Sequence, residues 1–145
     1  MINMQAPNLG LAVIIHSLDH ALAALVAAER VGRAITLLSP SGAAGSMGPL
    51  LFMSIVAQAR TRHPAVPVDA VLDCGDRAGD ALAALRQGVP AIRFTGRADV
   101  ADKLAAIAAQ RGQRVLRSEL PALDLLHRTD SNTALALWLD GVAKG

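Results

Sequence analysis

The chain has 145 residues, of which 52% are hydrophobic and 18% charged, and its formal net charge is +2 at pH 7. Disordered chains show the opposite balance, and this length suits one domain, so we expect residues 1–145 to fold as a single unit. The arginines are scattered from Arg30 to Arg128, and there are two phenylalanines, one tryptophan and no tyrosine. Neither a dense basic face nor a base-stacking platform is expected, which argues against nucleic acid as a partner.

The cellular location is inferred from cysteine usage and from the N-terminal segment. Cys74 is the only cysteine and cannot form an internal disulfide, so nothing points to an oxidising compartment. The apolar run at 9–15 has no basic residue before it and is followed at once by His16 and Asp19, unlike a signal peptide. No apolar run approaches the ~20 residues of a membrane helix. We therefore expect a cytoplasmic protein that does not associate with membranes.

Short apolar runs alternate along the chain with alanine-rich helical segments, and glycine or proline stands at the joints. The predicted strands are 11–15, 34–38, 68–72, 91–95 and 113–117. The predicted helices are 18–31, 48–62, 77–87, 98–111 and 131–143, with a short turn at 121–127.

Strands joined by helical crossovers are parallel, and these connections are right-handed. The pattern therefore predicts a three-layer, doubly wound α/β domain with five parallel strands. The flavodoxin-like order 2-1-3-4-5 is the first choice, and the Rossmann-like order 3-2-1-4-5 is the alternative. In either arrangement a ligand site is expected beyond the carboxyl ends of the strands.

Two predicted helices are apolar on nearly every side, and such helices must be buried on nearly every side. The first has no polar side chain between His20 and Glu29, and the segment 49–57 contains only Ser54. One explanation is that the C-terminal segment 134–139 packs across one of them. The favoured explanation is a homo-oligomer that associates through residues 48–62, with the segment 50–53 in contact.

The loop after the second strand is rich in glycine and serine and leads into a helix. Backbone N–H groups in such a loop can bind a phosphate or a carboxylate, which makes Ser41, Gly42, Gly45 and Ser46 candidate ligand-binding residues. The glycine spacing matches neither the dinucleotide fingerprint nor the Walker loop. The alternative is a connector in which Ser46 caps the next helix. Arg97, after the fourth strand, is the candidate that would orient the anion.

Three residues at strand ends are candidates for catalysis. His16 follows the first strand and could act as an acid or base, while Asp73 and Cys74 follow the third. Asp73 could equally pair with Arg97, and Cys74 could be a small buried hydrophobe. His16 and His20 are four residues apart, but His16 is expected to end the strand, so no metal site is predicted.

Missing residue types narrow the chemistry further. The only lysines are Lys103 and Lys144, neither near a strand end, so a Schiff-base aldolase is not expected. Without tyrosine and with few aromatic faces for a flavin, no cofactor is predicted. Three functions remain open: binding of a small anionic metabolite such as a phosphate ester or nucleotide, a small lyase, isomerase or hydrolase, and a non-catalytic self-association or docking module.

Overall fold

The computed structural model describes residues 10–143, which form one α/β domain of six strands and six helices. All five predicted strands and all five predicted helices are present, with ends within one or two residues of prediction. Two elements were not predicted: a four-residue helix, α2 (Ala43–Ser46), and a sixth strand, β6 (Ala122–Asp124), which stands where a turn was expected. The strands are β1 Leu11–Ile14, β2 Ile35–Leu38, β3 Val68–Asp73, β4 Ala91–Arg93, β5 Arg114–Leu116 and β6 Ala122–Asp124. The helices are α1 Leu18–Val31, α2 Ala43–Ser46, α3 Pro49–Arg62, α4 Ala78–Arg86, α5 Ala98–Gln110 and α6 Ser131–Ala143.

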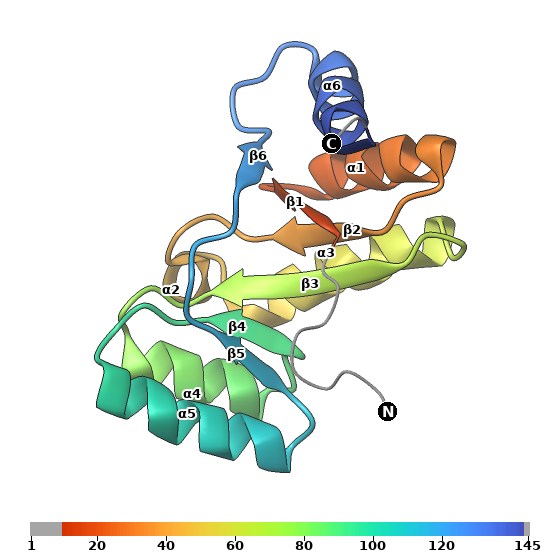
Figure 1. Cartoon of the computed structure of the whole chain (residues 1–145). Helices are drawn as coiled ribbons and strands as arrows, with labels where there is room; N and C mark the ends of the chain where they lie inside the picture. The colour runs from red at the N-terminus through yellow and green to blue at the C-terminus, as the bar shows by residue number, and fades with distance from the viewer. Residues whose placement is uncertain (1–9, 144–145) are drawn as a thin grey trace.

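The strands form one sheet in the order β5-β4-β3-β2-β1-β6, and every neighbouring pair is parallel. Both predicted strand orders were wrong, as was the number of strands. Strands β1 to β5 lie side by side in chain order, and only β6 returns to the other side of β1 (Figure 1). Each strand from β2 to β5 is therefore added on the same side of the previous one, and only β6 is added on the opposite side of β1.

The winding of the sheet also differs from the prediction. Right-handed crossovers that all advance in one direction place their helices on one face of the sheet. The main hydrophobic cluster joins helical residues such as Leu25, Phe52 and Leu85 to one face of the strands, including Leu37 and Ile92. A second cluster takes residues from the opposite face and contains no helical side chain. The domain is singly wound, with its helices on one side.

The face without helices has its own apolar belt. Leu38, Val71 and Ala91 are buried there, and Ile14, Leu116 and Ala122 pack against them. Side chains alternate across a strand, so the same face also carries polar residues above and below this belt. These polar residues are Thr36, Asp69, Asp73, Arg93, Arg114 and Asp124.

The link from β5 to β6 crosses the carboxyl ends of the other strands on this face (Figure 1). Arg93, at the end of β4, holds the link by donating from Nε to the carbonyl of Ser118 at 3.1 Å, and its Nη2 lies 3.6 Å from Glu119. Beyond the link, Leu125 donates its N–H to the carbonyl of Ile14. The crossover thus brings β6 to the free edge of β1.

The C-terminal helix α6 packs across α1, as the first explanation for the apolar helices proposed. Leu135 and Leu139 of α6 are fully buried, and Trp138 donates its indole N–H to the carbonyl of Ala12 at 3.1 Å. Helix α3 also packs against α1. No helix within residues 10–143 has the length and hydropathy needed to cross a membrane.

The packing of α6 on α1 can be tested with two leucines of the same helix. Leu139 is fully buried and Leu137 is 68% exposed. Leu139→Ala should lower the free energy of unfolding by about 2–5 kcal/mol, because it removes buried methyl groups and leaves a cavity. Leu137→Ala should change it by less than about 0.5 kcal/mol. Urea unfolding followed by circular dichroism measures both, and equal losses would contradict this packing.

Candidate functional site

The carboxyl ends of β1 and β6 bring together two histidines and an aspartate. His16 follows β1, and its Nε2 lies 2.7 Å from Oδ1 of Asp124, the last residue of β6. The backbone N–H of His16 donates to Nδ1 of His20, and the two imidazole rings meet edge to face with centroids 5.7 Å apart. Ser17 caps α1 by accepting from the N–H of His20, as expected for a helix that starts directly after the strand.

The hydrogen bonds of this cluster define the protonation of each ring. Since Asp124 accepts from Nε2 of His16, the neutral ring carries its lone pair on Nδ1, which has no partner within residues 10–143. Burial opposes ionisation of Asp124, but hydrogen bonds from the N–H of Leu126 and from His16 lower its pKa overall. Partial burial and the neighbouring His16 lower the pKa of His20. His16 therefore faces an ionised carboxylate and a neutral imidazole.

A surface hollow of about 390 Å³ opens directly after β6 and includes His127 and Arg128 in its lining. Arg128 donates from Nε to the carbonyl of Asp124 at 3.1 Å, which places a guanidinium at the same strand end as His16. His127 has φ 60, in the left-handed region that non-glycine residues seldom adopt. The turn after β6 thus places Arg128 against the backbone of Asp124, the residue whose side chain contacts His16.

Asp73, the second catalytic candidate, lies in a separate network. It is almost fully buried at the end of β3, pairs with Arg93, and accepts from the N–H groups of Gly42 at 2.9 Å and Gly75 at 2.8 Å. Ser39 accepts from its backbone N–H. Breaking such a buried ion pair typically costs about 3–5 kcal/mol. This network ties β2, β3, β4 and the β5–β6 link together.

The loop after β2 uses much of its backbone internally. The N–H of Gly42 donates to Asp73, and that of Gly45 donates to the carbonyl of Gly42. Ser46 is exposed and does not cap α3, whose N-cap is Gly48. Ser41 is exposed beside them. Fewer donors are free for an anion than the glycine spacing suggests.

The remaining two candidates lie apart from His16. Cys74 is buried, and burial, followed by the charges of Asp73 and Asp80, raises the pKa of its thiol to about 12. A thiol with that pKa stays protonated at neutral pH, which disfavours a nucleophilic role. Arg97 is exposed and forms a two-point ion pair with its near neighbour Asp99. Its predicted pairing with Asp73 is wrong, because Arg93 occupies that position.

Sequence reasoning missed Asp124, Arg93 and Arg128. Asp124 was placed in a turn, because β6 has only three residues and adds no long apolar run. Arg93 stood inside a predicted strand rather than after it, although two-residue alternation with Ala91 placed it on the polar face. Within residues 10–143, no three His, Cys, Asp or Glu side chains gather as metal ligands.

Comparison with known proteins gives a fold but no family. No family model matches the chain, and no curated protein matches it. Among solved structures, one similar chain is a protein of Coccidioides immitis named provisionally as a fructose-1,6-biphosphate aldolase, with a TM-score of 0.59 and 22% sequence identity. The match covers 74% of this chain and 40% of that one. At this identity the similarity shows an α/β fold and assigns no activity.

The lowered pKa of His20 predicts how stability depends on pH. A folded-state pKa below the unfolded value means that the unfolded chain binds more protons, so stability is lost as pH falls below about 6.5. Asp124, His16 and Asp19 are the charged or titratable groups that act on this ring together with its burial. Unfolding free energies at about pH 7.5 and 5.5 should differ less in His20→Asn than in the unmodified protein. An NMR titration that gives His20 a pKa at or above 6.5 would contradict this assignment.

Proposed function

We propose that this domain is a small enzyme that transfers a proton to or from an anionic metabolite at the carboxyl ends of β1 and β6. His16 is the acid or base, and Asp124 is the positioning residue that holds its ring. Arg128 binds the anionic group of the substrate. The reaction class is that of a lyase or isomerase, in which a C–H or O–H proton moves without a covalent enzyme intermediate.

The observation that carries this proposal is the 2.7 Å contact between Nε2 of His16 and the Asp124 carboxylate. A carboxylate on one ring nitrogen fixes the tautomer, so the other nitrogen carries the lone pair that can accept a proton. Both residues stand at the carboxyl ends of parallel strands, where α/β proteins bind their ligands. A hollow lined by His127 and Arg128 follows β6 three residues after Asp124, although His16 and Asp124 are not part of its lining.

The same arrangement supports the binding of an anion near β6 more than in the loop after β2. Arg128 uses Nε for the Asp124 carbonyl, and its two terminal nitrogens have no partner within the described residues. By contrast, Asp73 and other groups of the protein already take up the N–H groups of Gly42 and Gly45. Within residues 10–143 the only lysine is Lys103, which is exposed on α5, so the proposed chemistry does not use a Schiff base.

Proton transfer can be tested without knowing the final product. Small phosphorylated and carboxylated metabolites are incubated with the protein in D₂O, and loss of each substrate C–H signal is followed by ¹H NMR. His16→Gln should reduce the exchange rate of a responsive metabolite by about 10²–10⁴-fold, the usual contribution of a general acid or base. Asp124→Asn should reduce it less and shift its pH profile, because it leaves the imidazole in place but removes its partner.

His63→Gln is the matched control for this experiment. His63 also pairs with a carboxylate, Glu29, at 2.9 Å, but it follows α3 and is not at a strand end. Exchange should be unchanged in this variant. Equal exchange in His16→Gln and the unmodified protein would disprove the catalytic role of His16.

Self-association through α3 is a second candidate function, supported by two exposed leucines. Leu50 is 67% and Leu51 54% exposed at the start of the helix, whereas Phe52 is fully buried. The surface available to a second copy of the chain is therefore the face that carries Leu50 and Leu51. Phe52 belongs to the core of the domain and does not contribute to this surface.

Leu50→Asp tests self-association without disturbing the core, because the side chain is exposed. If the protein is a homo-oligomer through this face, the substitution should reduce the mass measured by light scattering to that of one chain. Leu137→Asp, an equally exposed leucine on α6, is the control and should leave the mass unchanged. An unchanged mass in Leu50→Asp would leave α3 without the proposed role.

A further inference from the structure

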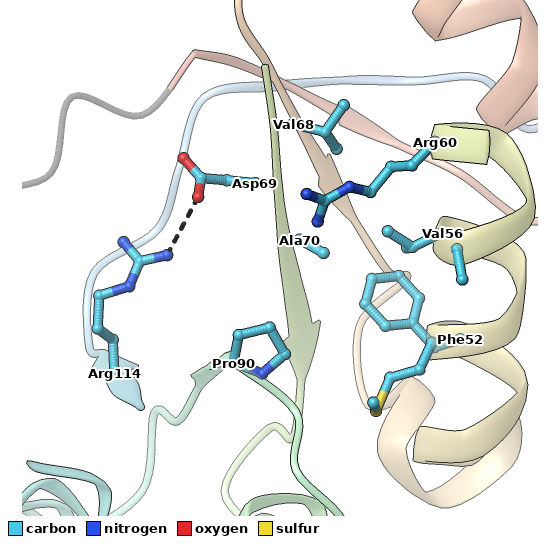
Figure 2. A pocket seen from close by; sticks show the side chains of 10 residues that line it. Phe52, Val56, Arg60, Val68, Asp69, Ala70, Pro90 and Arg114 are labelled. Carbon is cyan, nitrogen blue, oxygen red and sulfur yellow. Dashed lines mark hydrogen bonds and ion pairs between the residues drawn. The ribbon is translucent and has the colours of Figure 1, made fainter. Parts of the chain in front are cut away.

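A second cavity, of about 590 Å³, lies at the opposite end of the sheet from His16 (Figure 2). Its walls come from α3, from the first residues of β3 and from the residues at the starts of β4 and β5. The lining residues are Phe52, Met53, Val56, Ala57, Arg60, Val68, Asp69, Ala70, Pro90 and Arg114. Its size falls within the roughly 300–1,000 Å³ typical of sites for small molecules.

The cavity exists because β3 begins before β4. β3 pairs with β4 through Leu72 and Asp73, which lie opposite Ile92 and Arg93. The segment 68–70 therefore extends past the start of β4. Pro90 stands just before β4 and has no N–H with which to continue the pairing. Helix α3 forms the opposite wall, so the unpaired half of β3 faces a space rather than a strand.

The wall formed by α3 is apolar except at one position. Met53, Val56 and Ala57 supply its apolar surface, and Phe52 lines it from a fully buried position. Arg60, one turn beyond Val56, extends its guanidinium toward β3 between Val56 and Val68, as Figure 2 shows. Arg60 has no hydrogen bond or ion pair within the described residues 10–143. The cavity thus combines a hydrocarbon surface with one cation that has no counter-ion.

The other two charged residues of the lining, Arg114 and Asp69, form an ion pair whose charges cancel. Nη2 of Arg114 lies 3.4 Å from Oδ1 of Asp69, and the dashed line in Figure 2 marks this contact. Nη1 of Arg114 is buried without a partner in the same part of the chain. Two arginines and one aspartate leave the lining with a formal charge of +1. A ligand with one negative charge would balance it.

We infer that this cavity binds a small monocarboxylate with a hydrocarbon body. The hydrocarbon lies against Met53, Val56 and Ala57, where it leaves water, and the carboxylate pairs with Arg60. A planar guanidinium can donate two parallel hydrogen bonds to a carboxylate, which is the geometry that favours arginine at such sites. This site is separate from the proposed proton-transfer site, because it lies at the amino ends of the strands.

Octanoate is the probe for this site, and isothermal titration calorimetry is the measurement. Octanoate should bind to the unmodified protein, and 1-octanol, which has the same hydrocarbon body without the charge, should bind at least about tenfold more weakly. Arg60→Gln should weaken octanoate binding by about tenfold or more, because the charged hydrogen bonds are lost. Arg62→Gln removes an exposed arginine from the same helix outside the cavity and should leave the affinity unchanged.

A steric variant provides an independent check. Ala57 lines the cavity and is exposed on α3, so Ala57→Trp fills part of the space without entering the core and should abolish octanoate binding. His16→Gln should bind octanoate as well as the unmodified protein, which separates this inference from the proposed activity. The inference is overturned if octanoate does not bind at millimolar concentration, if octanol binds as tightly, or if Arg60→Gln binds octanoate normally.

Discussion

Because β1 to β5 join the sheet in chain order, all of their crossover helices lie on one face, and the opposite face must be closed by other means. The chain closes it with its own side chains and with the link from β5 to β6. Between the polar residues at the two ends of the strands, the belt of Leu38, Val71 and Ala91 excludes water from this face of the sheet. Arg93 then anchors the link at the carboxyl ends through the carbonyl of Ser118. Without this crossover, β6 would not reach β1, and Asp124 would not reach His16.

The polar residues at the carboxyl ends divide into two groups with different physical roles. Around Asp73, nearly every donor and acceptor is used inside the protein, and the ion pair with Arg93 is almost buried, so this group stabilises the fold. Around His16, Asp124 holds one ring nitrogen and is itself about half exposed, while the other ring nitrogen has no partner among residues 10–143. A side chain whose orientation is fixed but which keeps an unused hydrogen-bonding atom can bind a substrate. A side chain whose hydrogen-bonding atoms are all used within the protein cannot.

The two proposed sites use opposite ends of the same strands. At the carboxyl ends, His16 and Asp124 form the pair proposed for proton transfer, and Arg128 places a positive charge at the end of β6. At the amino ends, the late start of β4 leaves a cavity whose apolar wall contains Arg60. Each site depends on a short strand: β6 has three residues and carries Asp124, while β4 has three residues and exposes half of β3. Short strands at these positions produce both the catalytic pair and the cavity.

The sequence by itself determined β1 to β5 and every helix except α2, because two-residue and helical periodicities are local and the glycines and prolines at the joints end each element. It also identified His16 as a strand-end residue beside a helix cap. Only the tertiary structure decided the strand order, since a right-handed crossover can place the next strand on either side of the previous one, depending on which face of the sheet its helix covers. The partner of His16 was out of reach for the same reason. Asp124 lies 108 residues away in sequence, on a strand too short for a periodic signal, and the two meet only because β6 pairs with β1.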